Sequence, residues 1–440
     1  MAIRTRLTRG SGTTLRRLLP IDGIGRGGIV AAGATSIMLR ALLLLGKFAF
    51  IVALARYTGP ATVGLYALLV TIITISIYAM GLEIHTFTTR EIVSDDEDGR
   101  GAEHIQSHLL TVGGAFLIAL PVVYGFGIFL GIVGKFSFPL LAAILLCEAI
   151  GQELGRYLMV MMRPVASNLL QFIRGAAWMP VPLVALLTTT PVHTINIILW
   201  SWLAGASAAC AFGLWMIRGY FVRAQRYRLA WLGQAFLSAR HYFVVALLTQ
   251  VQYYSDRFIV QRAMGESFVG VYSFYQSFAN TMMTFVQTGV IAVLLPRLLR
   301  AAKQNERVVE RKTLTSMLVW SMALALAISG VLAAAMPFLL NQVQKAAYAS
   351  ALPAFYVLLV GNLLLIAGII AHLGLYARRR DADLMRVALG VIPLGLVINI
   401  FTIPHFGILG ASVTFAVTAL LELAAKSVLL WRLDRKSDIQ

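Results

Sequence analysis

Charged residues are scarce in this sequence. Of its 440 residues, 13% are charged and 59% are hydrophobic. Soluble globular proteins contain roughly 45–50% apolar and about 25% charged residues, so this chain has too little charge to cover a water-exposed surface. The composition excludes a soluble enzyme, a disordered scaffold and a secreted disulfide-rich module, and it predicts a protein with many membrane spans.

Cysteines and acidic residues are also few. Cys147 and Cys210 both lie in apolar segments, which predicts packed thiols rather than a disulfide or a metal pair. There are 19 acidic residues against 37 Lys and Arg, for a net charge of +18. In a membrane protein this excess reflects basic cytoplasmic loops, so we expect no nucleic-acid partner.

Motifs for enzymatic chemistry are absent from the sequence. We find no P-loop, no nucleophile elbow and no spacing typical of metal ligands. The sequence therefore predicts a protein that is not an enzyme and that has no metal site or cofactor. A membrane polysaccharide polymerase is an alternative class, but it is expected to have a large external loop.

Twelve apolar stretches are long enough to cross the hydrocarbon core, which takes about 20 residues of helix. They predict an all-α polytopic membrane protein of twelve transmembrane helices. The stretches lie near residues 29–55, 62–83, 107–132, 138–162, 166–187, 194–217, 241–262, 268–295, 314–340, 352–375, 385–402 and 409–430.

The basic residues predict the orientation of the chain. Alternate loops and the two termini hold 27 Lys and Arg, whereas the opposite loops hold four. The positive-inside rule then places both termini in the cytoplasm. Residues 1–28 are basic and polar, so we expect a cytoplasmic arm there and no cleavable signal peptide.

Short motifs recur in the two halves of the chain. Phe50-Ile51-Val52 is followed by Gly64-Leu65-Tyr66, and Phe258-Ile259-Val260 is followed by Gly270-Val271-Tyr272. Helix-end motifs come next in both halves, at Thr89-Arg90-Glu91 and Leu295-Pro296-Arg297. Six spans in each half give both halves the same orientation, which predicts a pseudo-two-fold axis along the membrane normal.

The repeat defines the expected domains. The N-lobe holds spans 1–6 and the C-lobe spans 7–12, with substrate between them and access alternating by rocking. The predicted boundaries are 1–28 for the arm, 29–217 for the N-lobe, 218–240 for a cytoplasmic linker, 241–430 for the C-lobe and 431–440 for a cytoplasmic tail.

These motifs resemble those of bacterial polysaccharide (O-antigen type) flippases. The resemblance lies in Ala55-Arg56-Tyr57-Thr58-Gly59-Pro60 with Gly64-Leu65-Tyr66, and in Asp256-Arg257-Phe258-Ile259-Val260 with Met264-Gly265 and Val269-Gly270-Val271-Tyr272. The flippases belong to the multidrug/oligosaccharidyl-lipid/polysaccharide exporter superfamily. Motif similarity covers about a quarter of the chain, and the span count and topology cover all of it.

The resemblance implies a fold and a function. It implies two six-helix lobes around a central cavity, in the bacterial cytoplasmic (inner) membrane. It implies a flippase that moves an undecaprenyl-pyrophosphate-linked oligosaccharide from the inner to the outer leaflet for polysaccharide synthesis, such as lipopolysaccharide or exopolysaccharide. The expected partners are this lipid-linked oligosaccharide, membrane lipids and polysaccharide polymerase or export machinery.

Basic residues inside the spans are the first candidate site. A charge at mid-bilayer costs about 2.5–3.5 kcal/mol on insertion scales, so it usually faces a cavity or a partner. Arg40 and Lys47 are seven residues apart in span 1 and share a face, and Arg174 lies in span 5. We expect these cavity cations to bind pyrophosphate or acidic sugars; pairing with acids on other spans is the alternative.

Three acids are candidate cavity or coupling groups: Glu148, Glu153 and Asp256. Glu148 has no basic partner in its own helix and could pair with Lys47 or carry a proton. Glu153 can pair with Arg156 three residues on. Asp256 is a better candidate than Arg257 for a cavity role or for coupling to H⁺ or Na⁺, and its alternative role is to hold the lobes together through an opposite Arg or Lys.

Polar residues beside Asp256 suggest a wet face. Gln250, Gln252 and Tyr253 suit sugar hydroxyls, so we expect them in the cavity wall. Glu422 and Lys426 are spaced for a structural ion pair within span 12.

A cation-coupled multidrug antiporter of the same superfamily remains an alternative function, and that class needs an acidic cavity.

Overall fold

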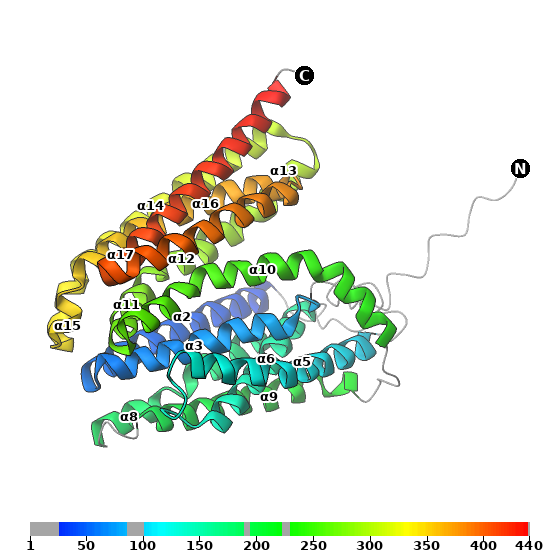
Figure 1. Ribbon diagram of the computed structural model, residues 1–440. Coiled ribbons are helices and arrows are strands. Elements are labelled where there is room, and N and C mark those ends of the chain that lie inside the picture. Colours follow the sequence, from blue (N-terminus) through cyan, green and yellow to red (C-terminus); the bar gives the residue numbers. More distant parts are fainter. Residues whose placement is uncertain (1–25, 86–100, 189–193, 222–228, 439–440) are drawn as a thin grey trace, which may run out of the picture. The chain divides into compact units, whose positions relative to one another are not determined.

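The computed structural model describes residues 26–85, 101–188, 194–221 and 229–438 (Figure 1). All regular structure in these ranges is helical, which confirms the predicted all-α fold. The predicted arm up to residue 25, the motif at Thr89-Arg90-Glu91 and linker residues 222–228 lie outside the described residues.

Ten helices in the described ranges are long and apolar enough to cross a membrane, so the chain is a multi-pass membrane protein. The predicted spans 385–402 and 409–430 both lie in α17 (Asp381–Asp438), which Gly407 interrupts with φ 61° and ψ −143°. The span at 241–262 lies in α10 (Leu229–Met264), which is 36 residues long but too polar to be among the ten. The count of twelve stays a prediction.

The helices group into two compact units. Unit 1 contains the described parts of residues 1–49 and 72–246, and unit 2 contains residues 50–71 and 247–440. Residues 50–71 thus group with the second half of the chain, although their sequence position is in the first half. The lobe boundaries drawn from the repeat stay a prediction.

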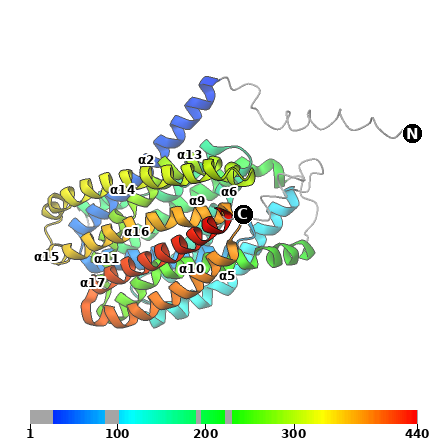
Figure 2. The same cartoon turned by 90° about the horizontal axis from the view of Figure 1, so that it is seen from above.

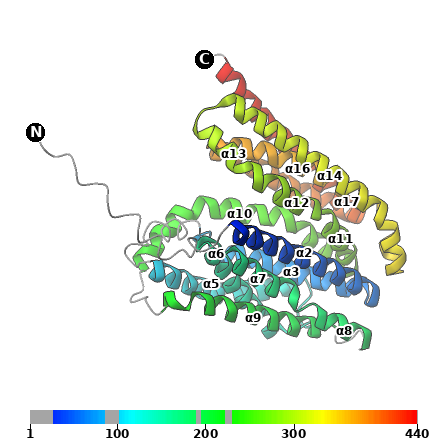
Figure 3. The ribbon, with the colours of Figure 1, turned by 180° about the vertical axis from the view of Figure 1, so that it is seen from behind.

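Unit 1 is built around α6, which packs against α9 and α7 (Figure 3). It also contains the first part of α2 (Arg26–Tyr57), the end of α3 (Pro60–Gly81) and the start of α10. Its complete elements are α5 (Gly101–Phe129), α6 (Phe138–Val160), α7 (Pro164–Phe172), the π-helix η1 (Ile173–Ala177), α8 (Pro180–Thr188) and α9 (Thr194–Phe221).

A buried apolar cluster fixes α6 between its neighbours. Its members come from α5, α6, α7 and α9, and they are Ile105, Leu154, Tyr157, Leu158, Leu170, Ala209 and Ile217. The predicted span at 166–187 is divided into α7, η1 and α8. α8 begins at Pro180, as expected for a residue that lacks the N–H needed in a helix interior.

Unit 2 contains the second half of the chain and the helical segments of residues 50–71. α14, α16 and α17 lie side by side in it (Figure 2). Its complete elements are α11 (Glu266–Ala279), α12 (Thr281–Val286), the π-helix η3 (Gln287–Ile291), α13 (Ala292–Lys303), α14 (Arg307–Val343), α15 (Ala346–Ala349), α16 (Leu352–Ala377) and α17.

Small residues bring α16 and α17 together. A Cβ atom at Gly361 would lie 2.6 Å from a ring carbon of Phe415, and one at Gly374 would lie 3.2 Å from Leu430. Membrane helices pack through such small residues because lipid tails give apolar side chains no strong preference for each other. The close contact with α16 fixes the position of α17, which carries several of the polar residues described below.

Candidate functional site

Lys47 is a candidate cation within the spans of unit 1. Its side chain is exposed, and among the described residues it has no hydrogen-bond or ion-pair partner. It lies beside η1, because a Cβ atom at Gly175 would be 3.9 Å from Lys47 Cε. The charges of Arg174 and Glu148 both act on its ammonium group. Lys47 is therefore close to an ion pair without being part of it.

Arg174, in contrast, has its donors occupied. Its Nε lies 3.3 Å from Glu148 Oε2, Nη1 donates to the Glu148 carbonyl oxygen at 3.1 Å, and Nη2 donates to Gln152 Oε1 at 2.7 Å. Trp202 Nε1 donates to Glu148 Oε1 at 2.8 Å. Four residues from three helical segments thus form one saturated buried network, which leaves Arg174 few donors for a substrate.

Two stacked indoles enclose this network. Trp178 and Trp202 have ring centroids 5.7 Å apart and planes 8° apart, and Trp178 Nε1 donates to the Arg174 carbonyl oxygen at 3.0 Å. That bond connects the residue that follows η1 to a residue within η1. π-Helical turns inside α-helices are frequent at functional sites. The hydrogen bonds of this network fix the position of η1, and Lys47 lies beside η1.

Arg40 is also open to ligands. Its side chain is exposed, and its Nε donates to Asn168 Oδ1 at 2.9 Å. Asn168 in turn donates to the Pro164 carbonyl oxygen at 2.8 Å. Only one guanidinium N–H of Arg40 is used among the described residues, so the remaining donors can meet an anion.

Glu153 forms the expected pair with Arg156, which confirms that contact. Arg156 Nη1 lies 2.6 Å from Glu153 Oε1 and 3.1 Å from His85 Nδ1. Glu153 is 1% exposed, and its Oε2 has no hydrogen-bond partner among the described residues. Glu153 therefore belongs to a buried polar cluster distinct from the network of Glu148.

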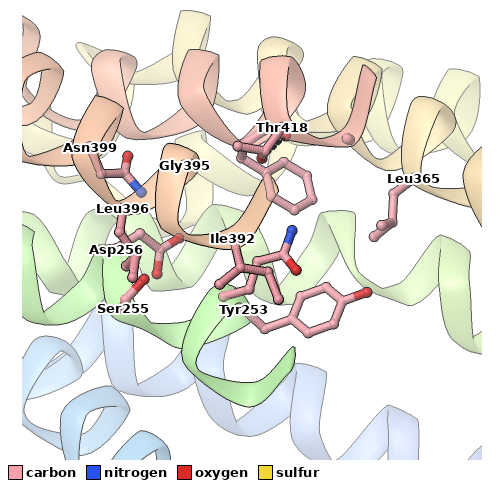
Figure 4. Close-up of a pocket in the computed structure, with 12 residues that line it drawn as sticks. Tyr253, Ser255, Asp256, Leu365, Ile392, Gly395, Leu396, Asn399 and Thr418 are labelled. Atoms are coloured by element: carbon pink, nitrogen blue, oxygen red, sulfur yellow. Dashed lines mark hydrogen bonds between the residues drawn. The ribbon is translucent and has the colours of Figure 1, made fainter. Parts of the chain in front are cut away.

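Unit 2 contains a small cavity of about 30 Å³ between α10, α16 and α17, which is lined by both polar and apolar side chains (Figure 4). Asp256 of α10 and Asn399 of α17 lie at one end of it, and Tyr253 and Leu365 lie toward the other. The lining residues are Gln252, Tyr253, Ser255, Asp256, Leu365, Ile392, Gly395, Leu396, Asn399, Phe415, Thr418 and Ala419. A water molecule needs about 10–15 Å³ by this measure, so the cavity is large enough for water or an ion and too small for a sugar.

Asp256 is 4% exposed and well supplied with donors. The Arg257 backbone N–H donates to its Oδ1 at 2.7 Å, and the Tyr272 hydroxyl donates to its Oδ2. The Arg257 side chain turns away, to Gln276 Oε1 at 2.8 Å and Thr71 Oγ1 at 2.7 Å. The two neighbouring charges therefore have separate partners, as their positions in the helix predict.

The remaining sequence candidates lie along α10 and α17. Gln252 donates to Glu422 Oε1 at 2.5 Å, and Lys426 donates to Glu422 Oε2, which confirms the predicted pair in span 12. Tyr253 lines the cavity, and Gln250 is half-buried on α10. A glycan-wall role for Gln250, Gln252 and Tyr253 stays a prediction.

Several residues of these networks could not be selected from the sequence. Gln152, Trp202 and Asn399 contact or face charged residues that lie on other helices. The Oδ1 of Asn399 is buried with no hydrogen-bond partner among the described residues. In the sequence, such a position is visible only as a polar residue within an apolar segment. Many polar residues of this kind only form hydrogen bonds between helices, so they do not identify a site.

The described residues contain no group of three or more His, Cys, Asp and Glu residues arranged to hold a metal ion. Cys147 and Cys210 are free thiols, as expected. Cys210 Sγ lies 3.0 Å from the Cys147 carbonyl oxygen, so it packs against the backbone of α6.

Comparison with known proteins gives one family match. The model of a family described as "Polysaccharide biosynthesis protein" matches residues 30–302. No curated protein matches the chain in sequence.

Solved structures share the fold. The chain is similar to an inward-facing multidrug resistance MATE family transporter of the MOP superfamily, at a TM-score of 0.66 and 13% identity, with 91% of this chain and 99% of that one covered. It is similar to the lipid II flippase MurJ, at a TM-score of 0.66 and 11% identity, with 90% and 86% covered.

A third similar structure is a MOP superfamily transporter from Pyrococcus furiosus, whose binding pocket is described as having reverse polarity that suggests a different function. The TM-score is 0.60 at 12% identity, with 92% of this chain and 95% of that one covered. At such low identities, these similarities establish the two-lobe fold of MOP superfamily transporters and leave the cargo open.

Proposed function

The chain belongs to the polysaccharide biosynthesis protein family, and from this premise we propose that it is a flippase for an undecaprenyl-pyrophosphate-linked oligosaccharide. The proposed movement is from the inner to the outer leaflet of the bacterial cytoplasmic membrane. The fold that it shares with transporters and with a lipid flippase supports transport rather than catalysis. The proposal rests on one observation, the open cations Arg40 and Lys47.

An anionic group is the natural ligand for these cations. Arg174 is balanced by Glu148 at 3.3 Å, and Arg156 is balanced by Glu153 at 2.6 Å, whereas Arg40 and Lys47 have no acidic partner among the described residues. Unit 1 thus carries excess positive charge within its spans. A cationic drug would be repelled by this charge, and a pyrophosphate would be attracted.

The spacing of the cations suggests two successive binding positions. Seven residues of helix separate Arg40 and Lys47, which is about 10 Å at 1.5 Å per residue. Arg40 lies nearer the cytoplasmic end in the predicted orientation, and its planar guanidinium suits bidentate binding of phosphate. Lys47 lies deeper and acts as a point charge. We propose that the pyrophosphate meets Arg40 first and then Lys47, while the lipid tail stays in the bilayer.

Energy for transport is proposed to come from an ion at Asp256. A buried carboxylate in the membrane needs a proton, a cation or strong donors, and here it borders a cavity large enough for an ion. Proton and sodium coupling are both compatible with Asp256, Ser255, Asn399 and Thr418. The membrane potential is a further source of energy for a charged substrate.

Lys47→Ala is the test of the cationic site. Liposomes containing the protein would be loaded with an undecaprenyl-pyrophosphate disaccharide, and its access to an external glycosidase would be followed. We expect Lys47→Ala to lower the initial rate about tenfold, because a hydrogen bond to a charged group contributes about 1.5–3 kcal/mol and 1.4 kcal/mol is tenfold. Lys47→Arg should retain much of the rate.

The matched control is Lys303→Ala, which removes an exposed lysine at the end of α13. An unchanged rate in folded Lys47→Ala protein would remove Lys47 from the site.

The antiporter alternative is favoured by the MATE likeness. Proton-driven uptake of an organic cation without lipid flipping would establish it and would make Glu148 and Asp256 the residues to pursue.

A further inference from the structure

Two glycines bring the equivalent helices of the repeat into direct backbone contact. A Cβ atom at Gly64 of α3 would lie 1.9 Å from the Glu266 carbonyl oxygen of α11. A Cβ atom at Gly270 of α11 would lie 1.9 Å from the Pro60 carbonyl oxygen of α3. Real Cβ atoms do not approach carbonyl oxygens this closely, so no residue other than glycine fits at either position.

The contact has the symmetry of the sequence repeat. Gly64 is the fifth residue of α3 and Gly270 the fifth residue of α11, and each belongs to a Gly-x-Tyr motif that opens the second helix of its half. Each glycine meets the carbonyl of the first residue of the other helix. Such reciprocal pairing is expected where two equivalent segments cross a pseudo-two-fold axis.

The crossing is close, but it is held by weak forces. Backbone contacts between helices provide Cα–H···O interactions that are much weaker than ordinary hydrogen bonds. Both partners are the first turns of helices, so the positive ends of two helix dipoles lie next to each other, which disfavours the contact. Because the glycines have no side chains, the two helices can also separate at this point without pulling interdigitated side chains apart.

Two hydrogen bonds accompany the crossing. Arg257 Nη1 of α10 donates to Thr71 Oγ1 of α3 at 2.7 Å, and Arg56 Nη1 of α2 donates to Gln342 Oε1 of α14 at 3.1 Å. Together with the glycines, they attach residues 50–71 to the second half of the chain. This explains why residues 50–71 group with unit 2.

The location of the crossing points to a gate. The hairpins before Gly64 and Gly270 lie on the side with four basic residues, opposite the side with 27, which is the extracellular side by the positive-inside rule. We propose that the Gly64–Gly270 crossing is the extracellular gate of this protein, closed in this structure and separated when the cargo leaves outward. The inference rests on the proposed transport function but not on the identity of the cargo.

The first experiment holds the gate open. Val63 is fully buried beside Gly64, so Val63→Cys reports opening in a background with Cys147 and Cys210 replaced by serine. A membrane-impermeant maleimide is added outside intact cells. Gly270→Ala should raise the initial labelling rate about tenfold, because the added Cβ cannot be accommodated in the closed contact.

Gly330→Ala is the matched control, since a Cβ atom at Gly330 of α14 meets nothing within 4 Å. It adds the same methyl group to a glycine of unit 2 and should leave the labelling of Val63→Cys unchanged. Equal labelling in Gly270→Ala and Gly330→Ala would overturn the gate, provided that both proteins elute as folded monodisperse species.

The second experiment holds the gate closed and decides the question if Gly270→Ala does not fold. Arg56→Cys and Gln342→Cys are joined by a bifunctional thiol reagent with a cleavable spacer. Flipping of an undecaprenyl-pyrophosphate disaccharide should fall at least about tenfold on cross-linking and recover on reduction. Single-cysteine proteins are the control.

The outcomes separate the gate from the cargo. Undiminished flipping in the cross-linked protein would show that this contact does not need to open and would overturn the proposal. Labelling that responds to Gly270→Ala in a protein that flips no lipid would support the gate and contradict the proposed cargo.

Discussion

Lys47 and Arg174 show that similar charges in a membrane can have different roles according to their partners. Arg174 donates to Glu148 and Gln152, so replacing it would leave a buried carboxylate unpaired, which is costly. Lys47 lies beside this pair and has no such partner among the described residues. A functional assay on Arg174 would therefore mix folding with binding, whereas Lys47 isolates binding.

A residue-scale prediction concerns His85, which lies just beyond α3. Burial, together with the charges of Arg156 and His108, lowers the pKa of His85 to about 3. The unfolded pKa is 6.5, so between about pH 3 and 6.5 the unfolded chain binds more protons than the folded one. Stability should therefore fall as the pH drops below 6.5, by about 1 kcal/mol per pH unit.

The measurement is the thermal midpoint in detergent between pH 7 and pH 4.5. His85→Gln should flatten the acid side of this profile, because glutamine does not titrate. Burial raises the pKa of Glu83 nearby, which acts in the opposite sense, since a folded state that keeps its proton loses stability as the pH rises. An acid side that is equally steep with and without His85 would contradict the prediction.

At the scale of helices, the pairing of α16 with α17 depends on glycine. Gly361→Ala would place its Cβ atom 2.6 Å from the Phe415 ring. We expect a loss of about 1–3 kcal/mol, the usual range for overpacking, measured as a lower denaturation midpoint. Gly113→Ala is the control, because nothing lies within 4 Å of its Cβ. Phe415→Leu combined with Gly361→Ala should recover part of the loss, and equal stability of the two alanine variants would contradict the prediction.

The helices themselves were predictable, because about 20 apolar residues in a row have few alternatives to a spanning helix. The pairs Glu153–Arg156 and Glu422–Lys426 were also predictable, since three or four residues of helix bring side chains together. The partner of Arg174 was not, because Glu148 lies on another helix and local spacing contains no information about it. The grouping of residues 50–71 in unit 2 could not be predicted for the same reason, since a helix crossing made by backbone atoms leaves only two glycines in the sequence.

At the scale of the whole molecule, the proposed cargo site and the proposed ion site lie in different units. Arg40 and Lys47 belong to unit 1, and Asp256 belongs to unit 2. Neither site alone can accumulate a cargo, because a transporter needs the occupancy of one site to change the equilibrium that governs the other. The polarity of the two sites fits an anionic cargo and a cationic coupling partner.

This division predicts the behaviour of Asp256→Asn. Asparagine can still accept the hydrogen bond from Tyr272, so the protein should fold. It should equilibrate an undecaprenyl-pyrophosphate disaccharide across liposomes, but an imposed proton or sodium gradient should no longer raise the initial rate. Applying each gradient separately to the unmodified protein identifies the ion, and Asp381→Asn, at the exposed start of α17, is the control.

The size of the expected effect follows from linkage. If one proton or sodium ion moves with each cargo, a tenfold concentration gradient supplies about 1.4 kcal/mol, which is a tenfold change in the equilibrium distribution of the cargo. That change should be present in the unmodified protein and in Asp381→Asn, and absent in Asp256→Asn. A gradient response that survives in Asp256→Asn would place the coupling elsewhere, and Glu148 and Glu153, which are buried acids of unit 1, would be the next groups to replace.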